Sequence, residues 1–522
     1  MSGRVLIYDT TLRDGAQTEG VSFSCEDKLD VLRRLDAFGI DFVEGGWPGS
    51  NPRDDEFFAK AGEMRLSTSL TAFGSTRRHD VAPEEDSNLV SLSKCSAEWC
   101  CIFGKSWDFQ VTDALKIHLE DNIRMVEDSI AFLRSKGKRV MFDAEHFFDG
   151  YKSNREYSLS VLDAAVRGGA EWVVLCDTNG GSMPSEVKDI VKDVLSRVDC
   201  AVGIHCHNDS DMATACSIAA VEAGATMVQG TINGLGERCG NANLCTVIPN
   251  LAFKCGYDLG KIDVKSVTPL SKAIGEIVNM PPSAGMPYVG ERAFAHKGGM
   301  HVSALVKDPR TYEHVPPESV GNSRRILVSD MAGRASITEK LRELGLEVGD
   351  DSSYITNMIK EMESKGYQFE GADASFEMLV KRLRGDIEPM FEVSGFRIFM
   401  DERKGGSMVS EASIKVSDAE GNVEHTAADG NGPVNALDNA LRKALAKFFP
   451  VLGEIRLTDY KVRVLDEKSA TAASVRVLIR STDGKDSWTT VGVSENVIEA
   501  SLIALVDSIE YALIKHSRKV KE

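Results

Sequence analysis

The sequence predicts an α/β protein whose N-terminal half is a (β/α)8 TIM barrel, followed by a small helical region and a C-terminal α+β domain. Up to about residue 255, eight short apolar runs alternate with helical segments. Eight such units in about 250 residues match the usual size of a (β/α)8 barrel. A doubly wound open sheet is the alternative, and the count of eight favours the barrel.

The eight predicted strands are short runs rich in apolar residues. They are RVLIYD (4–9), DFVEGG (41–46), RLSTSLTAF (65–73), WCCIFG (99–104), KRVMFDAE (138–145), EWVVLCDT (171–178), AVGIHCH (201–207) and TMVQGTI (226–232). Between them, segments such as 26–39, 114–137 and 187–198 repeat apolar residues every three or four positions, which is typical of amphipathic helices. In a barrel, the loops that follow the strands form the active site.

Changes in composition divide the chain into four predicted regions. Residues 1–275 form the barrel, and residues 276–330, rich in glycine and proline, form a first linker subdomain. Residues 331–388 contain two amphipathic stretches and are expected to form a second, helical linker subdomain. Residues 389–522 are rich in strand patterns and are expected to form a separate domain without an obvious catalytic cluster.

The C-terminal domain contains an internal repeat. An order of strands, glycine turn and helix occurs twice, and a set of small and apolar residues recurs with it. Ala436, Ala440 and Leu441 return as Ala500, Ala504 and Leu505, at a constant offset of 64. This offset predicts two copies of one strand–strand–helix unit.

The composition is that of an ordinary globular protein, with 42% hydrophobic and 27% charged residues among 522. The net charge of −18 argues against nucleic acid or an anionic membrane as a partner, since both bind basic surfaces. The 11 cysteines include no Cys-x-x-Cys pair, which favours reduced thiols over disulfides. No apolar run approaches the ~20 residues that cross a bilayer, and the chain begins without an apolar leader. We therefore expect a cytoplasmic protein.

His205 and His207 lie two positions apart in the seventh predicted strand. Residues i and i+2 of a strand point to the same face, so both imidazoles would enter the barrel mouth together. Neutral imidazole is a good ligand for zinc, manganese, cobalt or iron. The alternative is a pair of hydrogen-bonded histidines that bind no metal.

Polar residues near the ends of other strands strengthen the metal hypothesis. Asp14 follows the first strand and can supply a carboxylate, which would leave coordination positions open for a substrate. Its neighbour Arg13 offers a forked donor to a carboxylate or an oxyanion. Asn241 is a candidate fourth ligand, and Glu145 could act as a base, position a substrate or pair with Arg13. The alternatives are a helix-capping aspartate, a surface arginine, a turn residue and a structural ion pair.

Three motifs, in this order on an eight-unit barrel, resemble the metal-dependent acyltransferases of the DRE-TIM metallolyase superfamily. They are DTTLRDGAQ (9–17), GIHCHND (203–209) and NGLGERCGNANL (233–244). This group includes the isopropylmalate, homocitrate and citramalate synthases. Residues 427–445 and 488–501 are similar to the allosteric LeuA-dimer domain that ends isopropylmalate and citramalate synthases. The resemblance covers nearly the whole chain.

Within this group, five further motifs are most similar to the citramalate synthases. They are FGKSWD (103–108), FDAEHFFDGYKSN (142–154), LCDTNGG (175–181), HKGGMHVSA (296–304) and YEHVPPESVGNSRR (312–325). Isopropylmalate synthases tend to carry an aspartate where this chain has His146. This departure is the main reason to expect pyruvate as the 2-oxoacid.

The resemblance implies that pyruvate, the co-substrate acetyl-CoA and water give (R)-citramalate and CoA, a reaction that enters isoleucine biosynthesis. It implies that a divalent cation (Mn, Mg, Zn or Co) is held by Asp14, His205 and His207, with Asn241 as a further ligand. Arg13 would neutralise the developing alkoxide. Thr178 would bind the pyruvate carboxylate.

The resemblance also extends to residues that follow the barrel. Glu145 would take part in catalysis together with His301 as the expected base and Tyr312 as a proton donor. The last two would come from the partner subunit, so the active form is expected to be a homodimer. The terminal domain implies feedback inhibition, with isoleucine as the expected effector.

Three other functions remain open at this point. Isopropylmalate or homocitrate synthases run the same chemistry on larger 2-oxoacids, and lyases with the same barrel cleave carbon–carbon bonds. A catalytically inactive barrel that senses an amino acid through residues 389–522 is an alternative of another class. The intact set of Arg13, Asp14, Glu145, His205 and His207 argues against inactivity.

Overall fold

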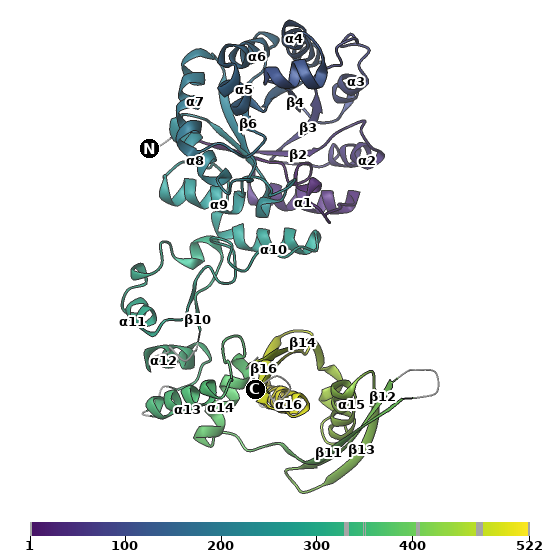
Figure 1. Ribbon diagram of the computed structural model, residues 1–522, viewed down its shortest axis with the longest axis vertical. Helices are drawn as coiled ribbons and strands as arrows, with labels where there is room; N and C mark the ends of the chain where they lie inside the picture. Colours follow the sequence, from purple (N-terminus) through teal and green to yellow (C-terminus); the bar gives the residue numbers. More distant parts are fainter. Residues whose placement is uncertain are drawn as a thin grey trace. The chain divides into compact units, whose positions relative to one another are not determined.

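The computed structural model describes residues 3–327, 334–347, 349, 351–402, 408–465 and 473–519. Two compact units are present, the first made of Met1–Phe294 and Glu313–Arg324, and the second of Ala295–Tyr312 and Arg325–Glu522 (Figure 1). The boundary predicted between residues 330 and 331 lies outside the described residues. The four ranges 1–275, 276–330, 331–388 and 389–522 therefore stay predictions.

The first unit is a closed barrel of eight parallel strands in chain order. The strands are β1 (Leu6–Asp9), β2 (Phe42–Gly46), β3 (Ser69–Ser75), β4 (Trp99–Lys105), β5 (Arg139–Glu145), β6 (Trp172–Asp177), β7 (Ala201–Cys206) and β8 (Met227–Gly230). Closure comes from β1, which pairs with β8 in the register Leu6↔Met227. The predicted barrel is confirmed, and the open sheet is excluded.

Helices surround the barrel (Figure 1). They are α1 (Cys25–Phe38), α2 (Pro52–Ala61), α3 (Ser87–Lys94), α4 (Leu119–Ser135), α5 (Phe147–Ser153), α6 (Arg155–Gly168), α7 (Pro184–Arg197), α8 (Ala213–Ala223), α9 (Leu244–Pro249) and α10 (Val267–Ile277). Local sequence sets their ends. At the start of α1, for example, Ser24 and Asp27 form a reciprocal capping box, and Gly39 ends the helix in the left-handed conformation.

One predicted helix is interrupted. Residues 114–137 were expected to form a single helical stretch, but a π-helical turn, Gln110–Leu115, ends there and α4 begins only at Leu119. Lys116 adopts a left-handed conformation with φ 58°, which breaks the hydrogen-bond ladder between the two segments. The apolar periodicity continues across this break, and for that reason the pattern alone did not reveal it.

The barrel interior is filled by an apolar cluster and by a few buried polar groups. The cluster consists of Tyr8, Phe42, Phe73, Trp99, Cys101, Met141 and Met227. Glu44, Asp143 and Gln229 are also buried. Because a buried charged or polar group is costly unless it is paired, their presence inside the barrel indicates a functional role or a specific network.

The second unit begins with a short parallel pair and helices. These are β9 (Ala295–His296), α11 (Gly299–Lys307), β10 (Arg325–Ile326), α12 (Arg334–Glu343), α13 (Ser352–Ser364) and α14 (Asp373–Arg384). Residues of α12, α13 and α14 share an apolar cluster with Val491, on the last strand of the domain that follows. The predicted helical region therefore packs on the C-terminal domain.

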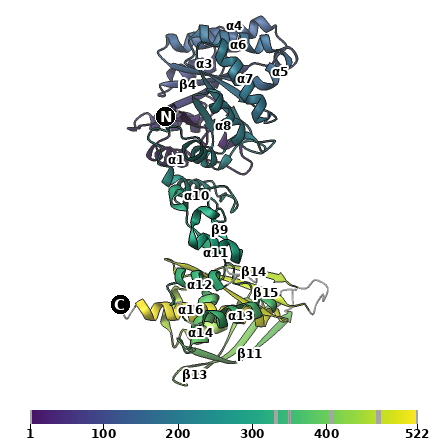
Figure 2. The ribbon, with the colours of Figure 1, turned by 90° about the vertical axis from the view of Figure 1, so that its left-hand side faces the viewer.

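The C-terminal domain holds two antiparallel three-stranded sheets, each followed by a helix. The elements are β11 (Phe391–Glu402), β12 (Met408–Asp418), β13 (Val423–Gly430), α15 (Pro433–Leu445), β14 (Arg456–Val464), β15 (Val475–Thr482), β16 (Ser487–Ser494) and α16 (Val497–Lys519). The two sheets lie on opposite sides of α16 (Figures 1 and 2). All six recurring residues of the repeat are buried in one shared core. Each unit has three strands before its helix, so the repeat is present but the predicted strand–strand–helix order is wrong by one strand.

Among the described residues, no helix combines the length and apolar character needed to cross a membrane.

The last strand of each repeat approaches its helix through a glycine. A Cβ atom on Gly492 would lie 2.0 Å from the carbonyl oxygen of Ala500 in α16, and one on Gly430 would lie 2.3 Å from the backbone nitrogen of Ala436 in α15. These distances are far below a normal van der Waals contact, so any larger residue must push the helix away from the sheet.

We predict that Gly492→Ala lowers the free energy of unfolding of the C-terminal domain by about 1–3 kcal/mol, the usual cost of overpacking. Urea unfolding followed by circular dichroism measures it. Gly453→Ala is the matched control, because a Cβ there meets no atom within 4 Å. Equal urea midpoints for Gly492→Ala and the parent protein would contradict this packing argument.

Candidate metal centre and active site

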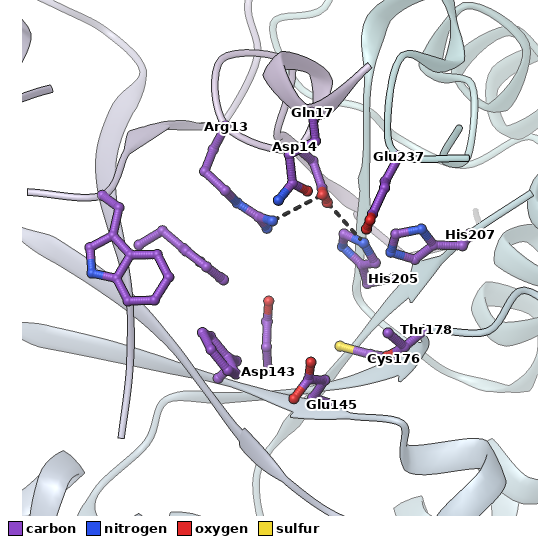
Figure 3. A pocket seen from close by; sticks show the side chains of 13 residues that line it. Arg13, Asp14, Gln17, Asp143, Glu145, Cys176, Thr178, His205, His207 and Glu237 are labelled. Atoms are coloured by element: carbon purple, nitrogen blue, oxygen red, sulfur yellow. Dashed lines mark ion pairs between the residues drawn. The ribbon is translucent and has the colours of Figure 1, made fainter. Parts of the chain in front are cut away.

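A cavity of about 210 Å3 opens at the carboxyl ends of the barrel strands (Figure 3). This is the end at which a (β/α)8 barrel carries its active site. Six of the residues predicted from the sequence line it, namely Arg13, Asp14, Glu145, Thr178, His205 and His207. They come from the ends of β1, β5, β6 and β7 and the loops that follow, so barrel closure brings them together.

Asp14, His205 and His207 converge at one point of this cavity. One ligand atom from each lies within 4.8 Å of the others, and all three residues are buried. The carboxylate of Asp14 is 3.2 Å from Nε2 of His205. Asn241 joins them by donating from its Nδ2 to Asp14 Oδ2 over 2.8 Å. The chain therefore places all four predicted ligands together.

The polar atoms of this cluster fit a divalent cation. Nδ1 of His207 and Oδ1 of Asn241 are buried and have no hydrogen-bond partner within the described part of the chain. Such atoms normally find a partner, because an unsatisfied buried polar group costs about 1–3 kcal/mol. A carboxylate, two imidazoles and an amide oxygen form a mixed donor set that suits first-row divalent metals.

Electrostatics keep Asp14 and His207 in the forms that bind metal. Burial alone would raise the pKa of Asp14, but the charges of Arg13 and His205 nearby lower it well below its ordinary value. Burial, helped by the charge of His205, lowers the pKa of His207 to about 3. Asp14 is therefore an anion and His207 a neutral ring at physiological pH, as metal coordination requires.

Arg13 is held rigidly beside the ligands. Its NH1 lies 2.9 Å from Asp14 Oδ1, and its Nε lies 2.5 Å from Glu44 Oε1. The guanidinium carbon lies 3.8 Å from the centre of the Phe73 ring, a cation–π contact. Glu44 also accepts a hydrogen bond of 2.6 Å from the hydroxyl of Tyr8. Arg13 is thus fixed between two carboxylates and an aromatic face.

Glu44 was not among the predicted site residues, although its signal was present in the sequence. It is the charged residue in the middle of the predicted strand run DFVEGG (41–46), and it is fully buried. A carboxylate in such a run needs a cationic partner. The structure also corrects one of the three roles considered for Glu145. The prediction that Glu145 pairs with Arg13 is wrong. Glu145 forms an ion pair with Lys105, and Glu44 forms the ion pair with Arg13.

Thr178 lies in the loop after β6, at the edge of the cavity. Its Oγ1 accepts a hydrogen bond of 2.8 Å from the backbone N–H of His146. His146 adopts a left-handed conformation with φ 56°, which is uncommon for a residue other than glycine. The loops after β5 and β6 are thereby tied together beside Glu145.

His301 and Tyr312 belong to the second unit and do not line the barrel cavity. Their rings stack on each other, with 4.2 Å between centroids and an interplanar angle of 28°. The Tyr312 side is open to solvent, since the residue is 46% exposed. The structure therefore pairs these two residues with each other, and their catalytic roles stay predictions.

Comparison with known proteins covers almost the whole chain. Three family models match it: HMGL-like over residues 4–274, homocitrate synthase post-HMGL domain-like over residues 288–367, and LeuA allosteric (dimerisation) domain over residues 370–513.

Curated relatives match it end to end. The (R)-citramalate synthase of Aquifex aeolicus is 55% identical over 522 residues, covering 99% of each chain, and that of Geobacter sulfurreducens is 51% identical, covering 98% of each. A probable 2-isopropylmalate synthase of Methanopyrus kandleri is 32% identical, covering 98% of each chain. With this identity and the HMGL-like barrel, the chain belongs to the (R)-citramalate synthase family.

Proposed function

We propose that this protein condenses pyruvate with acetyl-CoA and hydrolyses the thioester, which gives (R)-citramalate and CoA. The observation that carries this proposal is the 55% identity, over the full length, to a chain named (R)-citramalate synthase. The cavity supports it, because the side chains needed for a metal-assisted condensation already meet there.

In this proposal Asp14, His205, His207 and Asn241 hold a divalent cation. When bound, the cation supplies a Lewis acid that polarises the 2-oxo group of pyruvate. Arg13 neutralises the alkoxide that forms as the acetyl carbon attacks. Its ion pairs hold it in place before the reaction, so little reorganisation is needed when charge develops. Thr178 binds the pyruvate carboxylate.

An aromatic wall supports pyruvate as the 2-oxoacid. Trp47, Phe73 and Phe103 line the cavity, and their ring centroids lie 5.4–5.8 Å apart in stacked and edge-on pairs. Trp47 is further fixed by a 2.8 Å hydrogen bond from its indole nitrogen to Asn88. These packed rings leave little freedom to widen this side of the cavity for a larger 2-oxoacid side chain.

The methyl group of acetyl-CoA is a weak acid, so its deprotonation requires a placed base. His301 is the base and Tyr312 the proton donor in this proposal, both supplied by a second copy of the chain. The stacking of the two rings supports their joint action, and the match to a dimerisation domain supports a homodimer. Glu145 then positions the substrate, held by its ion pair with Lys105.

The terminal domain gives feedback control by isoleucine. A cavity of about 610 Å3 lies between α15 and β14, with Val434, Leu457 and Tyr460 as an apolar part of its wall. Asp438 and Arg442, which pair at 2.8 Å, supply charges of both signs. A branched amino acid has the complementary chemistry, an apolar side chain next to an ammonium and a carboxylate.

We predict that His207→Ala loses divalent metal after dialysis and that its turnover falls on the order of a hundredfold or more, as when a catalytic charge stabiliser is removed. Metal analysis and thiol release from acetyl-CoA measure both effects. His79→Ala is the control, since His79 is exposed, does not line the cavity and pairs with Asp121. Near-normal turnover of the parent enzyme in strict chelator would contradict the metal role.

Thiol release measured with pyruvate, 2-oxoisovalerate and 2-oxoglutarate tests the proposed reaction. We expect a clear preference for pyruvate, and Phe103→Ala should raise relative kcat/KM for 2-oxoisovalerate by roughly tenfold, the value of a few methylenes of pocket space. Phe253→Ala, a partly exposed position away from the cavity, is the control. Preference of the parent enzyme for a larger acid, or cleavage of hydroxymethylglutaryl-CoA, would refute the assignment.

We predict that Asp438→Ala raises the isoleucine concentration needed for half-inhibition at least tenfold and leaves uninhibited turnover unchanged. The loss of a charge partner for the ammonium group is the reason. Asp459→Ala, on the surface of β14, serves as the control. Inhibition curves that coincide for Asp438→Ala and the parent would place the effector elsewhere.

A further inference from the structure

A buried chain of hydrogen bonds runs from the metal centre into the barrel core. Nδ1 of His205 lies 2.8 Å from Oε1 of Gln229, its neighbour in register on β8. The other end of the same amide donates from Nε2 to Asp143 Oδ1 over 3.1 Å. The thiol of Cys101 donates to the same Asp143 oxygen over 3.1 Å. All four residues are buried.

The polarity of this chain has one consistent direction. When Asp143 is ionised, its Oδ1 accepts from both donors, so the amide of Gln229 presents its NH2 group to Asp143. A flipped amide would place its oxygen against the oxygen of Asp143. The carbonyl oxygen of Gln229 therefore faces His205 and can only accept, which requires a hydrogen on Nδ1 of that ring.

In the neutral ring, a hydrogen on Nδ1 leaves the lone pair on Nε2, the nitrogen that lies 3.2 Å from Asp14 and faces the metal cluster. His207 differs, because its Nδ1 is buried without a partner among the described residues. Of the two imidazoles, only that of His205 has its tautomer and ring orientation set by a hydrogen bond on the nitrogen that points away from the cluster, within the described residues.

We propose that Gln229 is a positioning residue that fixes His205 in the Nδ1-protonated tautomer, and that Asp143 and Cys101 fix the orientation of Gln229. This inference rests on the metal centre of the proposed function. Hydrogen bonds to the far nitrogen of a metal-binding histidine hold the ring in place and raise its basicity, and losing one typically weakens metal binding 10–100-fold.

The test is calorimetric titration of the metal-free protein with Mn2+. Gln229→Met keeps the length and apolar volume of the side chain but removes the acceptor, and we expect a Kd about 10–100-fold weaker than that of the parent. Met227→Ala is the matched control. Met227 is fully buried on the same face of β8, so this variant loses packing without losing a hydrogen bond of the chain, and its Kd should stay within about twofold.

A double variant, Gln229→Glu with Asp143→Asn, exchanges the carboxylate and the amide between the two positions. An acceptor for Nδ1–H of His205 is kept. The glutamate accepts from both His205 Nδ1–H and the new amide, so Kd should return to within about threefold of the parent. If Gln229→Met does not fold, this variant decides: parent-like affinity supports the inference, and tenfold weaker binding overturns it.

Parent-like affinity of Gln229→Met, or an equal loss in Met227→Ala, would also overturn the inference. Failure of the parent protein itself to bind Mn2+ would instead refute the metal centre of the proposed function, so the two failures are distinguishable.

Discussion

The hydrogen bonds between β1 and β8 are the constraint on which the site depends. Asp14 follows the first strand, and His205, His207 and Asn241 lie about 190 to 230 positions later. Only closure of the sheet brings these segments to one rim, and the pairing of Asp9 with Gly230 sets the height at which they meet. An open sheet with the same strands would leave the carboxylate and the imidazoles on opposite edges.

Charge balance within the closed barrel explains why so many ionisable groups can be buried together. Asp14 and Glu44 are both carboxylates out of contact with water, and either alone would favour its protonated form. Arg13 lies between them and stabilises the ionised state of Asp14, while the Tyr8 hydroxyl satisfies the remaining oxygen of Glu44. The arginine therefore sets the charge of the candidate metal-binding cluster, in addition to the role proposed for it in the reaction.

The sequence was sufficient for the barrel, for the C-terminal repeat and for the convergence of the four metal-binding candidates, because each rests on periodicity or on strand order. It was not sufficient to predict which side chains from different barrel strands contact one another. Glu44 lies within β2 and Glu145 ends β5, and nothing in a single sequence says which of them meets Arg13. The answer depends on the stagger of the strands. Gln229 escaped notice for the same reason, since an amide within an apolar run has no periodic signal. The break at Lys116 depends on one backbone angle, which apolar spacing does not encode.

The cavity between α15 and β14 takes one wall from each copy of the duplicated C-terminal unit. A small molecule bound there would contact both copies of the unit, and neither copy alone supplies all the walls of the cavity. Occupancy would therefore raise the melting temperature of the whole domain in proportion to the logarithm of ligand concentration. Duplication of the unit would in this way have created a ligand-binding site at the interface between its two copies.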